Sequence, residues 1–446
     1  MKRSATTPKA APKAKKPRPE VPDYHLTPSL RDDDGKIIWP APKDKMEEAR
    51  RVIAECGKAN KKALICPDKD ADGLSSGVIL HRTLTLLGLA PDLISIHFPA
   101  KGNNLHDDVE RQRMTAVSPS YIFVLDQGSR HSPPLVPSPH QALVIDHHYA
   151  ASPSDFPEGA KFVTACSSPP VATSSLLTYE LCLPLHEGVK YSCDWLCVVG
   201  THGDLGNTIK WAPPFPDMSA CLKKYTKKAL NDAVSLLNAP RRTSTYDVAS
   251  AWSALLASST PSELLTNRRL LAARAEVNAE VERCTHTAPK FSIDGRIAVF
   301  RINSPAQVHP VIATRWAGHL QSKKLEIVLC ANEGYRDDGM INFSCRVARC
   351  AKDRDPPVNI IETLKAVAQA AERGDLLERL GESFARGHKE ASGGIVPAEE
   401  FEELMRALRV GEKPEKEGDT EVKKAKKETG SPQKNTLMNY FGKKAA

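Results

Sequence analysis

Short apolar segments that end at aspartates constrain the fold of this chain more than any other feature. KALIC, YIFVL and ALVI, which begin at residues 62, 121 and 142, each lead to an aspartate within two residues. Between the first two lies GLSSGVILHRTLTLLGL, whose apolar residues recur with helical spacing. Short, continuously apolar strands that alternate with helices are typical of a parallel sheet covered on both faces. The sequence therefore predicts an α/β domain built on a parallel sheet.

The remaining residues predict more helices and a second, smaller α/β domain. Helices are expected over residues 45–60, 172–200, 221–240 and 262–284, and the last is long, charged and amphipathic, as linking helices are. Strands and helices alternate again through RIAVFRI, HPVIATRWAGHLQ, KLEIVLCA and MINFSCRVA, before the glycine-rich RGHKEASGG at 386–394. We expect five regions: a disordered basic tail (1–40), the parallel-sheet domain (41–235), a helical connector (236–290), the smaller domain (291–410) and a disordered tail (411–446).

The basic excess lies at the two ends of the chain. Residues 1–20 contain seven Lys or Arg and one acid, and residues 411–446 contain nine Lys and six acids. The 390 residues between them contain 46 basic and 47 acidic side chains, although the whole chain carries a net charge of +8. Nucleic acid would therefore need a local basic groove or bound metal. No apolar run approaches the roughly 20 residues of a membrane span, so no membrane partner is expected.

Acidic and imidazole side chains collect at the predicted strand ends and in GTHGDLG. In chain order they are Asp68, Asp70, Asp72, Asp126, Asp146, His147, His148 and Asp204. The carboxyl ends of parallel strands meet at the sheet edge where α/β proteins bind ligands. Carboxylates with an occasional imidazole suit Mn²⁺ or Mg²⁺, and two such ions about 3.5–4 Å apart activate water toward a phosphodiester. Alone, DKDADG could cap a helix and DHH could lie at the surface, so the combination carries the prediction of a two-metal site.

These stretches occur in the order of a known family. DKDADG, VLDQGS, VIDHH and GTHGDLG resemble the four motifs of the DHH phosphoesterase superfamily, and the first has the D-x-D-x-D-G form of its RecJ-like exonuclease branch. LLNAPRR (236–242) resembles the start of the RecJ connector. GMINFSCR and RGHKEASGG resemble the Ser-x-Arg and G-G-H-x-x-A-A-G motifs of the DHH-associated C-terminal domain. The resemblance covers about residues 45–405 and implies a DHH catalytic domain, a connector and a substrate-binding domain, with the active site in a cleft between the two domains.

The resemblance also implies roles for individual residues. Metal ligation falls to Asp70, Asp126, His147 and Asp204, with Asp68 and Asp72 in or beside the ligand set and Asp146 and His148 as ligands or as groups that orient His147. The catalytic set would be Asp70, Asp126, His147 and His148, and the cofactor two Mn²⁺ ions, or Mg²⁺, bridged by Asp126. Substrate phosphate would meet Ser344, Arg346, Gly387, His388 and Gly393, where a guanidinium grips phosphate and glycines allow close backbone approach.

The chain departs from the family pattern in four respects. Arg386 replaces the first glycine of its motif, Ser392 replaces an alanine, and Pro240 replaces the glycine of the Asn-Ala-Gly-Arg stretch. Nothing after residue 405 is long enough for the oligonucleotide-binding domain that RecJ-like enzymes often add. Strand polarity and the choice between DNA and RNA therefore stay open.

Motifs in the two tails predict where the protein is located in the cell and what recruits it. PKAKKPRP (12–19) and KKAKK (423–427) indicate nuclear import, with a solubilising tail as the alternative. In KNTLMNYFGKK, one helical turn would join Leu437, Tyr440 and Phe441 into an apolar plug. This resembles the motif that docks replication proteins onto the sliding clamp, although Lys434 stands where that motif usually has Gln.

The sequence thus predicts a nuclear, RecJ-like exonuclease that trims single-stranded DNA from an end and is recruited by the sliding clamp. One alternative is a phosphoesterase for short oligonucleotides or cyclic dinucleotides, which the near-neutral central region mildly favours. Another is a non-catalytic replication scaffold, like the DHH relative in the eukaryotic replicative helicase. That alternative predicts lost ligands, whereas every motif here keeps its acid and His147 is present.

Overall fold

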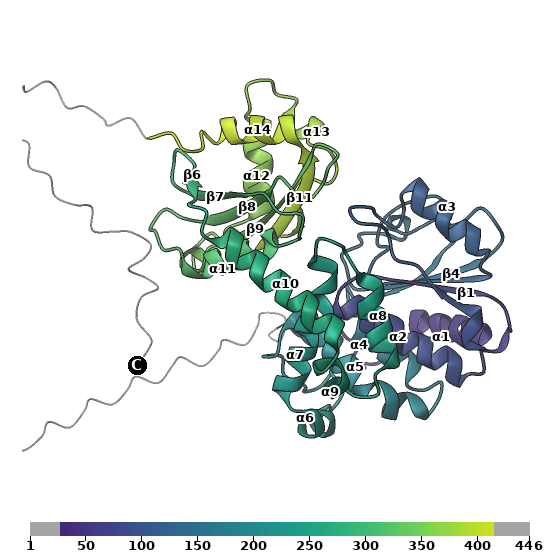
Figure 1. Ribbon diagram of the computed structural model, residues 1–446. Coiled ribbons are helices and arrows are strands. Elements are labelled where there is room, and N and C mark those ends of the chain that lie inside the picture. The colour runs from purple at the N-terminus through teal and green to yellow at the C-terminus, as the bar shows by residue number, and fades with distance from the viewer. Residues whose placement is uncertain (1–26, 414–446) are drawn as a thin grey trace, which may run out of the picture.

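The computed structural model describes residues 27–413, which form two α/β lobes joined by a long helix (Figure 1). The import-like basic clusters and the predicted clamp-binding residues Leu437, Tyr440 and Phe441 lie outside the described residues. Within residues 27–413, no helix is both long and apolar enough to cross a membrane.

The first lobe is built on the predicted parallel sheet. Its five strands have the order β2-β1-β3-β4-β5, and every neighbouring pair is parallel. They are β1 (Ala63–Pro67), β2 (Ile94–Ile96), β3 (Tyr121–Leu125), β4 (Gln141–Asp146) and β5 (Lys161–Thr164). Both faces of the central strands are buried: Ile65 and Phe123 face one core, while Leu64 and Val124 face the other. Their uninterrupted apolar sequence follows from this two-sided burial.

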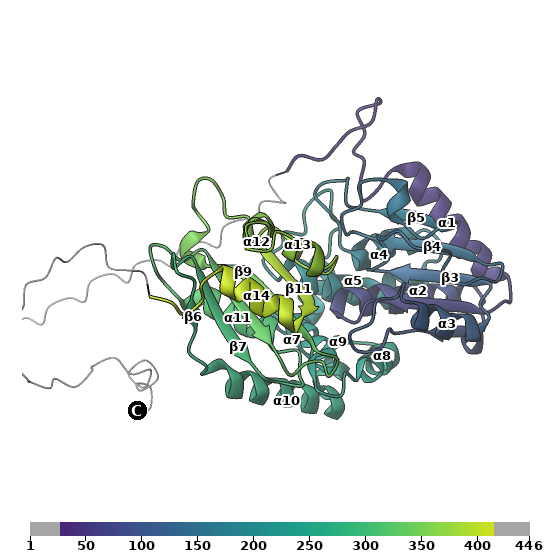
Figure 2. The same cartoon turned by 90° about the horizontal axis from the view of Figure 1, so that it is seen from above.

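Helices and loops cover the two faces of this sheet (Figure 2). The larger core lies under α1 (Lys43–Lys58), α2 (Ala71–Leu86), α4 (Ser174–Cys182) and α5 (Gly188–Leu205). The smaller core contains Met114 of α3 (Asp108–Val117) and loop residues such as Leu135 and Phe156. Residues 27–40, which the sequence assigns to the disordered tail, make defined contacts with the first lobe. Arg31 and Ile37 form an antiparallel backbone bridge, and the Trp39 indole donates to the Pro170 carbonyl.

A helical segment follows the first lobe. It consists of α6 (Ser219–Tyr225), α7 (Lys227–Asn238), the short 3-10 helix η4 (Pro240–Arg242), α8 (Val248–Ala257), α9 (Pro261–Leu265) and α10 (Arg268–Thr285). The single helices expected over 221–240 and 262–284 are each divided in two. Thr226, with φ of 62°, interrupts the first, and the Asn267 side chain begins a new helix by accepting the N–H groups of Arg269 and Leu270.

The second lobe contains a mixed six-stranded sheet in the order β10-β11-β9-β8-β7-β6. The strands are β6 (Lys290–Phe291), β7 (Ile297–Ile302), β8 (Ile327–Asn332), β9 (Met340–Val347), β10 (Arg386–His388) and β11 (Ala391–Pro397). Only β7 and β8 pair in parallel. The helices of this lobe are α11 (His309–His319), α12 (Ile360–Gln369), α13 (Leu376–Arg379) and α14 (Ala398–Ala407).

Helix α10 packs into both lobes, as its charged, amphipathic sequence predicts. Leu270 near its start belongs to the core of the first lobe, whereas Val277 and Val281 belong to the core of the second. Other contacts tie the lobes together: the Arg336 guanidinium donates to the Gly102 carbonyl at 2.8 Å, and Arg130 pairs with Glu382 at 3.1 Å. The α/β architecture with two sheets and a helical connection confirms the predicted fold class.

Candidate metal centre and phosphate-binding face

The predicted acidic residues meet at the carboxyl edge of the first sheet. Three overlapping groups have potential ligand atoms within 4.8 Å of one another. They are Asp72, Asp126, His147 and Asp204; Asp126, His147 and His148; and Asp68, Asp70 and Asp126. Asp126 belongs to all three, which suits the bridging position between two ions, and it has a left-handed backbone with φ of 61°.

The motif DKDADG serves as helix cap and as part of this cluster at once. Asp70 begins α2, and its Oδ1 accepts the N–H groups of Asp72 and Gly73. A Cβ on Gly73 would lie 2.6 Å from the Asp68 carbonyl oxygen, so only glycine allows the chain to turn this closely. Burial favours the protonated form of Asp70, but Arg241 and the capping N–H groups outweigh it and lower the pKa of Asp70.

Asp72 is anchored at the start of another helix. Its two oxygens accept the N–H groups of Ser174 and Ser175, at 2.7 and 3.0 Å, at the beginning of α4. Gly200 of α5 lies against this carboxylate, and a Cβ there would stand 2.2 Å from the Ser175 hydroxyl. Burial and the neighbouring Asp204 raise the pKa of Asp72 to about 6, as expected for like charges crowded without a cation.

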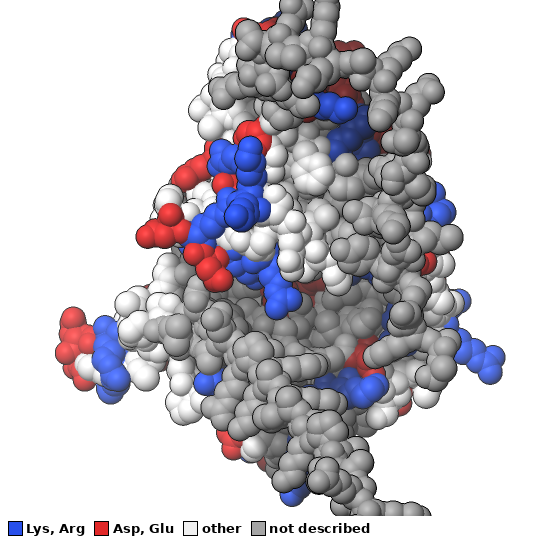
Figure 3. Space-filling model, turned by 90° about the vertical axis from the view of Figure 1, so that its left-hand side faces the viewer, with Lys and Arg blue, Asp and Glu red and all other residues white. Residues whose placement is uncertain are grey.

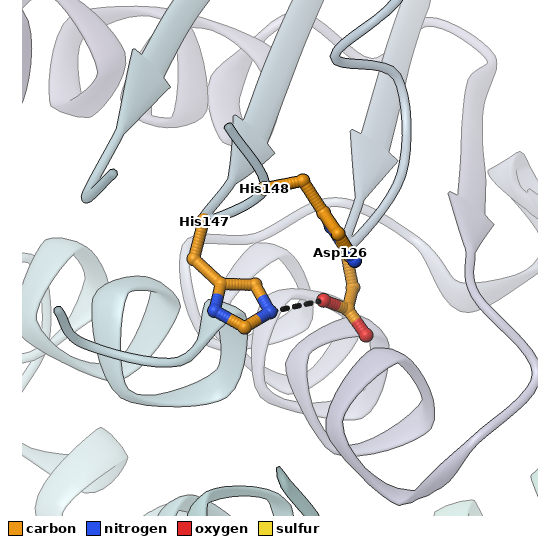
Figure 4. Close-up of side chains that lie close together, drawn as sticks. All are labelled: Asp126, His147 and His148. Atoms are coloured by element: carbon orange, nitrogen blue, oxygen red, sulfur yellow. Dashed lines mark ion pairs between the residues drawn. The ribbon is translucent and has the colours of Figure 1, made fainter. Parts of the chain in front are cut away.

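The His147 imidazole points from the end of β4 toward the Asp126 carboxylate (Figure 4). Its Nε2 lies 3.3 Å from Asp126 Oδ1 and 3.1 Å from Asp204 Oδ2, yet this buried nitrogen has no hydrogen bond of good geometry. Although burial opposes it, the two carboxylates raise the pKa of His147, and burial together with Asp72 raises that of Asp126. An imidazole nitrogen aimed between carboxylate oxygens is the arrangement that a cation would satisfy.

Asp146 supports the cluster from behind. Its Oδ1 accepts the N–H groups of His147 and His148 and lies 2.8 Å from His148 Nδ1, while its Oδ2 accepts both donors of Ser129. Burial favours its protonated form, but the His148 contact and these hydrogen bonds bring the pKa of Asp146 down to about 2. The carboxylate belongs to none of the three groups and orients the histidine loop instead.

Oxygen donors with one or two imidazoles fit Mn²⁺ or Mg²⁺, so the residues present can hold such ions. The ligand and catalytic assignments of the individual side chains stay predictions, including that of Asp146. Sequence reasoning missed Ser129, Ser174 and Ser175. Thr173 in VATSSLL caps α4 by accepting the Leu176 N–H, and this signal could have located the start of the helix, where Ser174 and Ser175 lie.

The predicted substrate residues of the second lobe lie on three adjacent strands. Ser344 and Arg346 are on β9, and the Arg346 guanidinium donates to the Ser344 hydroxyl at 2.8 Å. Strand pairing places Gly393 opposite Ser344 and Ala391 opposite both Arg346 and His388, so these positions share one face of the sheet. Gly387, with φ of 108°, lies opposite Ser392, one position along β10. A Cβ on Gly393 would lie 2.5 Å from the Phe343 carbonyl oxygen.

Basic side chains of the connector complete this region. Arg241 in η4 lies 3.8 Å from Asp70, and Arg242 beside it is partly buried, with a buried Nε that has no hydrogen-bond partner. Burial and the nearby Arg241 bring the pKa of Arg242 down to about 9. His309 of α11 is buried with an unpartnered Nδ1, and burial together with Arg346 and Arg242 brings its pKa down to about 3. Sequence reasoning did not single out these three residues.

Comparisons with known proteins were made for sequence and for structure. A scan against models of protein families finds no match, and no curated protein sequence matches the chain. Many solved structures resemble it in fold, among them the following three. RecJ from Thermus thermophilus, in complex with Mn²⁺, is 19% identical with a TM-score of 0.56 over 83% of this chain. The chain spans only 55% of that protein's length.

The other two structures match along most of their length. An exonuclease RecJ bound to manganese is 19% identical, with a TM-score of 0.55, over 83% of this chain and 94% of its own. The DHH domain of a protein described as belonging to a family of ribosomal proteins is 14% identical, with a TM-score of 0.58, over 82% and 90%. At such identities the likeness concerns the fold. This chain shares its fold with RecJ and with this DHH domain.

Proposed function

We propose that the chain is a metal-dependent phosphodiesterase that removes nucleotides from an end of single-stranded nucleic acid. The observation that carries this proposal is the convergence around Asp126, which follows β3, of carboxylates from the end of β1, from α2 and from α5, together with His147 after β4. When bound, two Mn²⁺ or Mg²⁺ ions would supply a nucleophilic hydroxide near neutral pH and stabilise the leaving oxygen.

The protein's own residues would position the reaction. Asp126 would contribute to holding both ions. His147 and Asp204 would hold one of them, and Asp68 and Asp70 would hold the other. Asp146 fixes the His147–His148 loop so that neither imidazole has to reorient when substrate arrives. The His148 side chain is about half exposed, so its ring can meet a substrate or product oxygen.

A phosphate would bind between the lobes beside this cluster. Arg242 and Arg346 both act electrostatically on His309, and both are partly buried, which makes their charges costly without a counter-charge. A substrate phosphate would supply that charge next to Asp70, which Arg241 already approaches. On the face shown in Figure 3 the described residues carry both basic and acidic side chains, and residues 21–410 contain 46 basic and 47 acidic side chains, so a local grip of this kind is the better source of affinity than overall charge.

Short oligonucleotides are the second candidate substrate, favoured by this mixed surface charge. Action on DNA in the nucleus, preference for Mn²⁺ and recruitment by the sliding clamp are further proposals, which rest on the sequence motifs. The non-catalytic scaffold becomes the better account only if the cluster binds no metal or cleaves nothing.

The test is hydrolysis of an end-labelled single strand and of a labelled dinucleotide, with Mn²⁺ and with chelator. We expect Mn²⁺-dependent release of mononucleotides from the strand, and a loss of at least about 10³-fold in Asp126→Ala and His147→Ala. Tyr191→Ala, an exposed substitution on α5, is the matched control and should keep wild-type rates. Faster cleavage of the dinucleotide would favour the small-substrate enzyme, and equal inactivity of all four proteins would favour the scaffold.

A further inference from the structure

A cavity of about 610 Å³ opens at the end of β2. Its walls come from residues 96–100 at the end of β2, from Arg113 of α3 and from residues 245–249, which lead into the first turn of α8. This volume lies within the range of small-ligand pockets. None of the metal and phosphate assignments above accounts for it.

The cavity lies at the same sheet edge as the aspartates. Strand β2 runs parallel to β1, and the His97 N–H donates to the Ile65 carbonyl at 2.9 Å, so both strands end together. Tyr246 connects the cavity with the metal centre. Burial raises the pKa of the Tyr246 phenol, and its next two influences are Asp68, which raises it, and Arg241, which lowers it. The Tyr246 N–H donates to the Thr243 carbonyl at 3.2 Å in the turn that follows η4, and Arg241 of η4 lies 3.8 Å from Asp70. This turn therefore leads from the carboxylates to the wall of the cavity.

The walls combine aromatic faces with polar groups. Phe98 is held by an edge contact with Trp252, at 6.0 Å between ring centroids, and Tyr246 has a left-handed backbone with φ of 54°, which is strained for a bulky residue. His97 Nε2 is buried and lies 3.0 Å from Glu110 without a hydrogen bond of good geometry. Arg113, which donates to Glu110 at 2.8 Å, keeps about half of its side chain exposed beside these rings. Such a wall suits a nucleobase, which has two flat faces and a polar edge.

We propose that this cavity takes the base of the terminal nucleotide whose phosphate reaches the metal centre. The ring of the base contacts Phe98 and Tyr246, and its polar edge faces Arg113. The inference rests on the proposed function, since it assumes a nucleotide ligand. It adds that the end of the strand is held through its base as well as through its phosphates.

Photolabelling locates the base directly in the wild-type protein. 8-Azidoadenosine 5′-monophosphate is irradiated with the Mn²⁺-loaded protein, and labelled peptides are identified by mass spectrometry. Labels should fall in the peptides that contain residues 96–100 or 245–249, and excess AMP should prevent them. Labelling elsewhere, or labelling that AMP does not prevent, would overturn the inference.

Calorimetry then measures what the base contributes. Wild type should bind AMP about 5- to 100-fold more tightly than ribose 5-phosphate, since stacking is the main difference between them. Phe98→Ala should remove most of this ratio while leaving ribose 5-phosphate binding unchanged; Phe98→Tyr and the control Tyr191→Ala should keep it. A ratio near one in wild type, or one that Phe98→Ala leaves intact, would contradict the pocket. A base-dependent ratio in a protein that cleaves no strand would support the pocket and reject the proposed function.

Discussion

At the scale of single residues, the site depends on carboxylates that do different work despite their similar sequence setting. Asp126 and Asp146 both end a central strand of the same sheet. Burial and the neighbouring carboxylate of Asp72 both raise the pKa of Asp126. The oxygens of Asp146 instead accept hydrogen bonds from Ser129 and the histidine loop, and its pKa is lowered. Asp126 is therefore free to bind a cation, whereas Asp146 stabilises the loop that carries the two imidazoles.

Asp146→Asn tests this division. The substitution keeps the size of the side chain but weakens the acceptors for the His147 and His148 N–H groups, so we expect Mn²⁺ affinity to fall about 10- to 100-fold. Isothermal titration with Mn²⁺ measures it. Asp155→Asn is the control, because Asp155 likewise accepts two backbone N–H groups, from Ala151 and Ser152, outside the cluster. Equal losses in both variants would show that loop order alone matters.

His309 gives a prediction for pH. Burial, Arg346 and Arg242 lower its pKa from 6.5 to about 3, so between these pH values the unfolded chain binds a proton that the folded chain does not. His309 therefore contributes stability above pH 6.5, and the free energy of unfolding falls by about 1.4 kcal/mol per pH unit as the pH drops toward 3. His309→Asn should reduce the slope between pH 6 and 4 by about that amount, measured by urea unfolding. An unchanged slope would mean that His309 is protonated in the folded protein.

Single residues were predictable from the sequence where a strand end fixes them. Asp68, Asp126 and His147 converge because parallel strands end at one edge, and this geometry needs no knowledge of side-chain packing. The role of Asp146 could not be found in this way, since it depends on the backbone path through Ser129 and the histidines. Arg242 of η4 and His309 of α11 come close only when the connector packs against the second lobe, and no local sequence pattern predicts that packing.

At the scale of elements, the segment 97–103 after β2 connects the base cavity with the second lobe. Lys101 donates to the Pro305 carbonyl and lies 4.2 Å from the Tyr335 ring centroid, while Gly102 accepts from Arg336. Glu110 of α3 is fully buried and holds this segment by accepting the Ala100 N–H at 2.9 Å and the Asn103 amide at 2.7 Å. These hydrogen bonds outweigh burial and lower the pKa of Glu110, so it stays ionised.

Glu110→Gln should therefore destabilise the protein by about 1–3 kcal/mol, because it removes a buried, charge-assisted acceptor of several hydrogen bonds. Chemical unfolding at pH 7 measures the loss. Asp108→Asn on the same helix removes only an exposed ion pair with Arg111, and it should change stability by no more than about 0.5 kcal/mol. If the two variants lose equal stability, the segment is held by something other than Glu110.

Elements were predictable where apolar periodicity is strong, and least so at their interruptions. The strands at 63–67, 121–125 and 141–146 follow the expected segments closely. The breaks at Thr226 and Asn267 were not predicted because the apolar pattern continues across both residues. Only the backbone conformation of Thr226 and the helix cap at Asn267 reveal them. Strand β5 and helix α8 were not predicted, and α8 supplies a wall of the base cavity.

At the scale of the whole molecule, the second lobe brings the proposed phosphate-binding face to the proposed metal site of the first. Helix α10, with its ends in two different cores, fixes the distance between them. The contacts of Arg130 with Glu382 and of Arg336 with Gly102 then hold the lobes together near the site. The active arrangement thus requires both lobes, although each has its own sheet and core.

The account's central claim is that Asp126 joins two metal ions into one site. Electron paramagnetic resonance during a Mn²⁺ titration tests it without reference to any substrate. We predict that two ions bind each wild-type chain and give the spectrum of a spin-coupled pair, and that Asp126→Ala abolishes the coupling. Binding of no Mn²⁺, or of isolated ions whose spectrum Asp126→Ala leaves unchanged, would contradict the account.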